Sequence, residues 1–364
     1  MSRCNAKNER IKRRYLCYLR EGRGLAETTI DHARLAIAEF EQFNGWAEFK
    51  KFRESDAIAY RKALLNGPSK RSAKLSSRAT VNTKLQQVEK FFRWLSHQEG
   101  FKKAIRLEEV ECFGLSRRDK RIALHTSPKP TPSVEEVRRA ILAMPSNTIV
   151  ERRDRALMSL LLLTGCRVGS AISLKLKHVH PNGCGINHDA REVSVKGAKS
   201  FPSYFFPVGD DIREIFQGYV DLLRSQLGWG ENDPLFPRTR QAVGAAHTFE
   251  TVGVERAHWN TVDPAQRIWR AAFQKAGLSR YSPHSVRRSL VSLGERLCRN
   301  PEEFKAWSQN LGHEDVMTTF RSYGPVADLR QSEILRSLGR SPKSDVDVLD
   351  EVAALLAARG FARR

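Results

Sequence analysis

Residues 156–171 read Ala-Leu-Met-Ser-Leu-Leu-Leu-Leu-Thr-Gly-Cys-Arg-Val-Gly-Ser-Ala. The nearly apolar run from Ala156 to Leu163 predicts a buried helix over residues 154–163, since it is far shorter than the roughly 20 residues that cross a bilayer. Thr164-Gly165 is typical of a helix stop. Arg167 is therefore expected at a helix junction, where its guanidinium can be held in place.

Three later patterns also contain residues suited to chemistry. Val195-Lys196-Gly197-Ala198-Lys199 is predicted at the tip of a hairpin with strands at residues 191–195 and 203–208. His284 and Arg287 are three residues apart, so they share one face near the start of a helix predicted over residues 285–297. Leu311-Gly312-His313 ends another predicted helix, and Tyr323 follows ten residues after the histidine. Alone, each pattern is weak, because such residues more often form a surface ion pair, a solvated turn, a helix cap or a packing contact.

The first part of the chain is predicted to be an all-helical domain over residues 1–116. Apolar residues recur at helical spacing over residues 27–43, 56–65 and 79–97. Thr28 or Thr29 is the expected N-cap of the first of these helices. The last helix carries Lys84, Lys90 and Arg93 on its polar face.

A basic stretch rich in proline, serine and threonine predicts a linker over residues 117–132. Ser133 and Glu136 form a capping-box pattern, so a second domain is expected to begin there and to extend over residues 133–341. Its helices are predicted at residues 212–227, 265–276, 285–297 and 301–311. Residues 342–364 are predicted to form an amphipathic tail helix.

The chain has 364 residues, 62 of them lysine or arginine and 41 aspartate or glutamate, which gives a formal net charge of +21. Residues 1–124 contain 28 basic and 15 acidic side chains and so carry +13 of that charge. This excess favours a nucleic-acid partner. The six cysteines form no Cys-x-x-Cys pair, which indicates reduced thiols in a cytosol. The absence of a signal-like or membrane-length apolar segment argues against a secreted or membrane protein.

Together and in this order, Arg167, Lys196, His284-x-x-Arg287, His313 and Tyr323 resemble the tyrosine recombinase (phage integrase) family. The strongest matches are Thr-Gly-x-Arg at 164–167, His-x-x-Arg-Arg at 284–288 and Leu-Gly-His at 311–313. The resemblance spans residues 26–323 and includes Phe91-Phe92-Arg93-Trp94-Leu95, which is typical of the last long helix of the family's core-binding domain. It implies a mainly α fold with a small β-hairpin or sheet: a helical core-binding domain and an α+β catalytic domain.

The resemblance implies a site-specific DNA recombinase of the integrase type, as found in mobile elements. Tyr323 would attack the phosphorus and form a 3′-phosphotyrosine bond. Arg167 and Arg287 would grip the phosphate oxygens, and Lys196 would protonate the departing 5′ oxygen. His284 would act in proton transfer with the tyrosine, and His313 would form a hydrogen bond to the phosphate. No metal or other cofactor is expected, because these side chains supply the nucleophile, the proton donor and the cations. Rejoining needs no ATP, because the phosphotyrosine keeps the energy of the broken bond.

Two residues depart from the family pattern. Ser170 stands where the family often has glutamate, and the spacing from His313 to Tyr323 is ten residues instead of the common nine. Lys199 competes with Lys196 for the lysine role, and Lys196 is preferred because it precedes the glycine as in the family's Lys-Gly-x-Lys turn.

Two other functions stay open at this stage: a type IB topoisomerase-like enzyme and a DNA-binding relative without catalysis. His178, His180, Cys184 and His188 fall within eleven residues, but their spacing matches no closed zinc pattern, so a metal is not expected.

The expected partner is double-stranded DNA, bound by a homo-tetramer on two sites, together with a directionality factor. The tail stripe of Val346, Leu349, Val352 and Leu356 would dock on a neighbouring protomer, or pack on its own domain. The expected location is the cytoplasm, at the nucleoid, and no membrane contact is expected.

Overall fold

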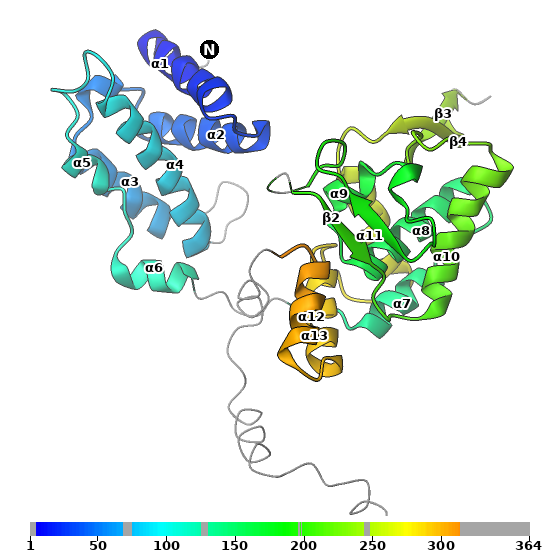
Figure 1. Ribbon diagram of the computed structural model, residues 1–364. Coiled ribbons are helices and arrows are strands. Elements are labelled where there is room, and N and C mark those ends of the chain that lie inside the picture. Colours follow the sequence, from blue (N-terminus) through cyan, green and yellow to red (C-terminus); the bar gives the residue numbers. More distant parts are fainter. Residues whose placement is uncertain are drawn as a thin grey trace, which may run out of the picture. The chain divides into compact units, whose positions relative to one another are not determined.

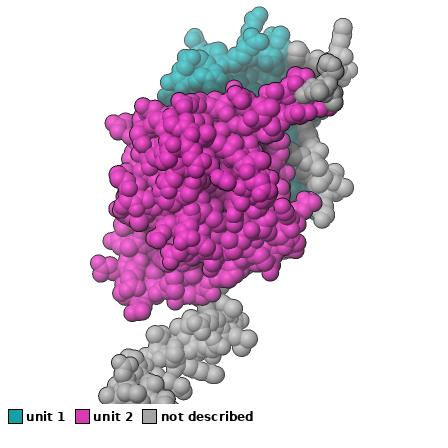
Figure 2. All heavy atoms as spheres, turned by 90° about the vertical axis from the view of Figure 1, so that its right-hand side faces the viewer, with its two compact units in different colours: residues 1–127 teal, residues 128–364 magenta. Residues whose placement is uncertain are grey.

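The computed structural model describes residues 5–67, 75–124, 130–195, 197, 199–243 and 248–313. The chain divides into two compact units, residues 1–127 and 128–364, which Figure 2 colours separately. Lys196, Tyr323 and the predicted tail helix lie outside the described residues. Within the described part, no helix has the length and apolar character needed to cross a membrane.

The first unit is built from helices, as predicted (Figure 1). The helix predicted over residues 27–43 has those bounds. Its N-cap is Ala26, whereas Thr28 or Thr29 was expected. Its core is a cluster of aromatic rings, in which Phe40 lies 5.3 Å from Phe92 and 5.1 Å from Tyr60 between ring centroids. The helices are α1 (Ala6–Cys17), a π-helical turn (Tyr18–Gly22), α2 (Glu27–Phe43), α3 (Glu54–Asn66), α4 (Arg78–Ser96), α5 (Leu107–Glu111) and α6 (Arg117–Leu124).

A buried polar group fastens α1, which the sequence analysis did not predict, to α2. The Asn8 side chain donates to the Glu41 carboxylate at 2.9 Å and to the Ala47 carbonyl at 2.9 Å, and its oxygen accepts from the Phe49 amide at 3.1 Å. Lys12 forms an ion pair with the other oxygen of Glu41. Because these partners satisfy one another, a helix with few apolar residues can be buried.

The segment 117–124 is helical, whereas the sequence predicted a linker beginning at residue 117. Ser116 caps α6, because its hydroxyl accepts from the Asp119 amide at 3.0 Å. The Asp119 carboxylate also lies 3.3 Å from the Arg78 guanidinium on α4. The basic composition that suggested a linker therefore belongs to an exposed helical face.

The second unit has a central helix, α8, surrounded by other helices and two small antiparallel sheets (Figure 1). The capping box of Ser133 and Glu136 is confirmed at the start of α7. The elements are α7 (Val134–Leu142), α8 (Ile149–Thr164), α9 (Val168–Ile172), β1 (Gly185–His188), β2 (Phe201–Tyr204), α10 (Asp210–Asp221), β3 (Pro237–Val243), β4 (Phe249–His258), α11 (Asp263–Lys275), α12 (Ser285–Leu297) and α13 (Pro301–Asn310).

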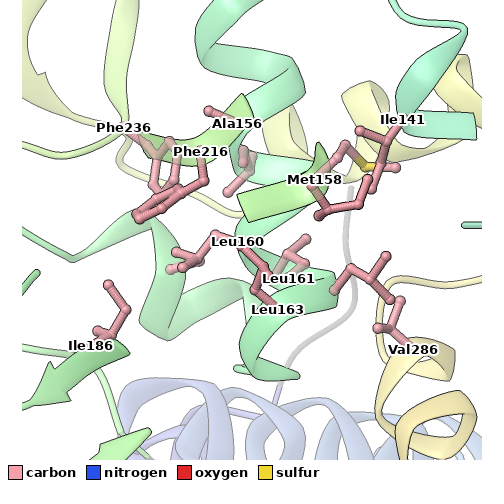
Figure 3. Packing of buried hydrophobic residues seen from close by; sticks show 14 of the residues in the cluster. Ile141, Ala156, Met158, Leu160, Leu161, Leu163, Ile186, Phe216, Phe236 and Val286 are labelled. Atoms are coloured by element: carbon pink, nitrogen blue, oxygen red, sulfur yellow. The ribbon is translucent and has the colours of Figure 1, made fainter. Parts of the chain in front are cut away.

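Helix α8 is the centre of the core, as Figure 3 shows from close by. Every residue from Ala156 to Thr164 is buried, which explains why the sequence there is apolar on all sides. Helices α7, α10, α11 and α12 pack around it. The end of α8 is thereby fixed, and the residues that follow it start from a rigid point.

The predicted hairpin strands were misplaced. Strand β1 lies at Gly185–His188 and pairs with β2 at Phe201–Tyr204, with His188 opposite Phe201. The segment 191–195 is not a strand, because the amides of Glu192 and Val193 turn back to the Asp189 carbonyl at 3.0 and 2.7 Å. The longer hairpin of β3 and β4 was not predicted.

Replacing Glu41 by alanine should lower the free energy of unfolding by about 3 to 5 kcal/mol, because it leaves Lys12 and Asn8 buried without their shared partner. Urea unfolding followed by circular dichroism measures the change. Glu48→Ala removes a solvent-exposed ion pair with Lys7 and should leave the unfolding midpoint almost unchanged. Equal losses in the two variants would contradict a structural role for the buried group.

Candidate active site

Arg287 joins the ends of two helices. It lies in the first turn of α12 and is 6% exposed. Its Nη1 donates to the Gly165 carbonyl at 2.6 Å, and its Nη2 donates to the Leu311 carbonyl at 2.6 Å. These carbonyls end α8 and α13, where helix carbonyls lack partners within the helix. The guanidinium is thus fixed in orientation by one carbonyl on each of its terminal nitrogens.

Gly165 makes this arrangement possible. Its φ of 61° lies in the left-handed region, and it is the C-cap of α8 as predicted. A Cβ at this position would lie 2.7 Å from Leu311 Cδ2 and 2.8 Å from Leu290 Cδ1. Only glycine therefore allows α8, α12 and α13 to approach closely enough for Arg287 to reach both carbonyls.

His313 is bonded to Arg287 and is neutral at pH 7. Its Nε2 lies 3.0 Å from Arg287 Nη2, and because arginine has no acceptor, this nitrogen accepts and the ring proton is on Nδ1. Burial and the positive charges of Arg287 and Arg167 lower the pKa of His313 to about 4. The side chain therefore offers a neutral N–H donor beside two cations.

Arg167 is the second cation. It is the N-cap of α9, is half-buried, and lines an open cavity of about 1080 Å³ together with His313. Burial and the charge of Arg167 lower the pKa of Arg287 to about 10, so the Arg287 guanidinium stays charged at pH 7. Among the described residues, none accepts a hydrogen bond from Arg167. Two repelling cations are stabilised when an anion binds between them.

The C-terminal end of α13 is bonded to β2. The Asn310 side chain accepts from the Tyr204 amide at 2.7 Å and donates to the Tyr204 carbonyl at 2.8 Å. Gly312 has a φ of 70°, and a Cβ there would lie 2.5 Å from the Phe201 ring. These contacts place His313 beside the hairpin. The sequence analysis did not single out Asn310, although it directly precedes Leu-Gly-His.

Four of the six predicted site residues fall in one part of the second unit. His284 is the exposed N-cap of α12, and its charge acts on His313. It therefore lies beside the group formed by Arg167, Arg287 and His313. Lys196 and Tyr323 lie outside the described residues. Lys199 is exposed and lines the same cavity as Arg167.

The four residues considered as zinc ligands have other surroundings. His178 Nδ1 accepts from the Lys175 amide at 2.9 Å, and His180 Nε2 lies 3.0 Å from Asn187 Oδ1. His188 is buried and stacks on Phe201 with 4.6 Å between ring centroids. Among the described residues, no group of three histidine, cysteine or acidic side chains is placed to hold a metal ion.

Residues 134–330 match the sequence model of the phage integrase family, which is more than half of the chain. The chain belongs to the phage integrase family. As a member of this family of tyrosine recombinases, it is a site-specific recombinase that cleaves and rejoins DNA strands.

Curated relatives cover most of this integrase-family chain. It is 22% identical to tyrosine recombinase XerC of Anoxybacillus flavithermus over 306 residues, which are 84% of this chain and 89% of the relative. It is 26% identical to tyrosine recombinase XerD of Vibrio vulnificus over 324 residues, which are 86% of this chain and 89% of the relative.

Solved structures show the same fold. A lambda integrase tetramer bound to a Holliday junction has a TM-score of 0.59 at 16% identity and covers 88% of this chain and 79% of its own. The XerH recombinase bound to palindromic difH substrate, in a post-cleavage complex, has a TM-score of 0.59 at 17% identity. The match covers 85% of this chain and 79% of the XerH chain.

Burial lowers the pKa of His188 to about 4, so the unfolded state binds a proton that the folded state excludes between pH 6.5 and 4. Stability should therefore fall as the pH falls through this window, by up to about 3 kcal/mol from this residue. Chemical denaturation at a series of pH values measures the slope.

The control is His188→Phe, which keeps a ring against Phe201. Its stability should fall less steeply over the same window, and the remaining slope comes from groups such as His313. Equal slopes in the two proteins would contradict a neutral buried His188.

Proposed function

We propose that the recombinase cuts DNA through Tyr323, with Arg167, Arg287, His313, His284 and Lys196 acting on the same phosphate. The observation that carries this proposal is the buried Arg287, which is held by two helix-end carbonyls and repelled by Arg167. A scissile phosphate placed between the two guanidinium groups would relieve this repulsion. The same contacts would stabilise the added negative charge of the transition state.

In the proposed reaction the Tyr323 oxygen bonds to phosphorus and the bond to the 5′ oxygen breaks. The phenolic proton passes by way of His284, and Lys196 gives a proton to the departing 5′ oxygen. His313 donates from Nδ1 to a non-bridging oxygen, which fits its neutral form. The reverse steps rejoin the strands, so the chemistry balances without an energy source.

The exposed location of His284 supports its proposed part in proton transfer, since an exposed imidazole can exchange protons with solvent. The buried location of Arg287 supports a fixed part in phosphate binding. A neutral His313 adds a donor without a third positive charge.

Covalent capture on fragmented host DNA tests the nucleophile. The wild-type protein, denatured in detergent, should retain DNA enriched for one or a few sequences, and Tyr323→Phe should retain none, because it lacks the attacking oxygen. Sequencing of the recovered DNA identifies the site.

Tyr281→Phe is the matched control, because Tyr281 packs on Phe273 and its ring remains in the variant. It should capture the same DNA as the wild type. Capture of DNA by Tyr323→Phe would overturn the assignment, and capture without sequence enrichment would favour a topoisomerase-like activity.

We further propose a homo-tetramer on two DNA sites, in which the tail beyond Ser344 docks on the neighbouring protomer. The spacing of Val346, Leu349, Val352 and Leu356 supports this arrangement. The fold shared with a lambda integrase tetramer also supports it. A directionality factor and action at the nucleoid in the cytoplasm belong to the same proposal.

Removing residues 344–364 should leave cleavage of one site intact but reduce tetramers on DNA at least tenfold, because each protomer loses an apolar contact. Sedimentation of the protein with DNA carrying the captured site measures assembly. Leu349→Ser with Val352→Ser should behave in the same way, and Asp347→Ser with Glu351→Ser should not. Unchanged assembly in the truncated protein would refute docking between protomers.

A further inference from the structure

Two serine hydroxyl groups hold both backbone polar groups of Ser194, two residues before Lys196. Ser170 Oγ donates to the Ser194 carbonyl at 2.8 Å. Ser173 Oγ accepts from the Ser194 amide at 2.9 Å and donates its own proton to the Ser170 carbonyl at 2.9 Å. We call Ser170, Ser173 and Ser194 the serine clamp.

The clamp is anchored on a fixed element. Ser170 is 2% exposed, and Ala171 and Ile172 of α9 are also buried. The Ile172 carbonyl lies 3.0 Å from His258 Nδ1, and the Leu174 carbonyl accepts from the Leu235 amide at 2.9 Å. A shift of helix α9 would therefore break the bond at Ile172 and disturb the buried bond at Leu174, directly after the helix.

The same short helix carries Arg167 at its start. Arg167 is the N-cap of α9, and its carbonyl accepts from the Ala171 amide at 2.9 Å. A single element thus holds the phosphate-binding arginine at one end and the backbone before Lys196 along its side. The backbone of Ser194 is thus joined to the helix of Arg167 by a direct hydrogen bond to Ser170.

The segment that enters the clamp is fastened at a second point. The Glu192 carboxylate lies 2.8 Å from Lys177 Nζ, 3.3 Å from Lys175 Nζ and 3.3 Å from His178 Nε2. The Ala190 amide donates to Ser200 Oγ at 2.9 Å on the other side of the loop. The chain from Ala190 to Ser194 therefore has a defined path.

Serine suits this position better than the glutamate that the family often has at residue 170. An ionised carboxylate only accepts hydrogen bonds, so it could not donate to the Ser194 carbonyl. A hydroxyl donates and accepts, and a pair of them satisfies both groups of one residue. In this chain Ser170 therefore supports the backbone at Ser194 by a hydrogen bond that the family's glutamate could not donate.

We propose that Ser170 and Ser173 are positioning residues, which fix the backbone before Lys196 to the helix that begins at Arg167. This inference rests on the proposed function of Lys196 as the proton donor. The clamp fixes Ser194, two residues before the proposed proton donor, to the helix that begins at the proposed phosphate-binding arginine.

A change of leaving group isolates the proton-transfer step. When Tyr323 attacks, the bond between phosphorus and the 5′ oxygen breaks, and the departing alkoxide takes the proton of Lys196. If sulfur replaces that oxygen, the thiolate leaves without a proton, because a thiol has a pKa of about 8.5. DNA with a bridging 5′ sulfur therefore does not require a placed Lys196.

The experiment measures cleavage rates of the Ser170→Ala, Ser173→Ala double variant on a duplex carrying the captured site, with oxygen or with sulfur at the 5′ bridge. With oxygen, the rate should fall about tenfold to a hundredfold, the loss that a misplacement of about 1 Å brings. With sulfur, the rate should stay within about twofold of wild type. Thermal melting confirms that the variant is folded.

Ser159→Ala is the matched control, because Ser159 is also a buried serine but bonds only to the Arg155 carbonyl of its own helix. It should cleave both substrates at the wild-type rate. Ser173→Thr keeps the hydroxyl and should restore most of the rate on the oxygen substrate.

Equal losses of the double variant on both substrates would overturn the proposal, because the clamp would then act through Arg167 or through the fold. Full activity on the oxygen substrate would also overturn it. The Lys196→Ala variant tests the proposed function of Lys196 independently of the clamp. This variant should cleave only the sulfur substrate efficiently. If it cleaves neither, or both, Lys196 is not the proton donor.

Discussion

The burial of one arginine is the constraint on which the catalytic unit depends. A guanidinium that is 6% exposed requires hydrogen-bond acceptors, and Arg287 finds two of them in the carbonyls at the ends of α8 and α13. These bonds bring together helices that are far apart in the sequence. They require glycine at residue 165, and they leave His313 as a neighbour whose protonation the arginine itself opposes. Packing, backbone conformation and charge are thus linked through a single side chain.

This link explains how the unit keeps cations close together before DNA arrives. Repulsion between Arg167 and Arg287 costs free energy, and the buried core around α8 supplies the rigidity that maintains it. A neutral His313 limits the cost. The fold itself holds these cations in place, so the phosphate that we propose to bind there would require little rearrangement.

The sequence predicted the elements whose own residues determine them. The run from Ala156 to Leu163 is apolar on every side, and Ser285–Leu297 has strong helical periodicity, so both helices were identified correctly. Helix α1 was missed because its burial depends on Glu41, a partner distant in sequence. The hairpin strands were misplaced because the chain turns at Asp189, where the carbonyl accepts from the amides of Glu192 and Val193 and the carboxylate accepts from the Arg191 amide. The sequence analysis did not recognise this side-chain turn. Of the site, the sequence predicted Arg167, His284, Arg287 and His313, which lie in one part of the second unit; their roles stay predictions. The role of Ser170 needed the structure, because its partner is the carbonyl of Ser194.

The side chain of Asn310 has a consequence for how copies of the protein meet. Its amide binds the Tyr204 amide and carbonyl on the side of β2 that faces away from β1, much as a residue of a third strand would. An open strand edge invites pairing with the edge of another molecule. Because α13 covers this part of the edge, the small sheet next to the catalytic residues is protected from strand-to-strand aggregation. If copies assemble on DNA as we propose, they can then associate through other surfaces without pairing of their hairpins.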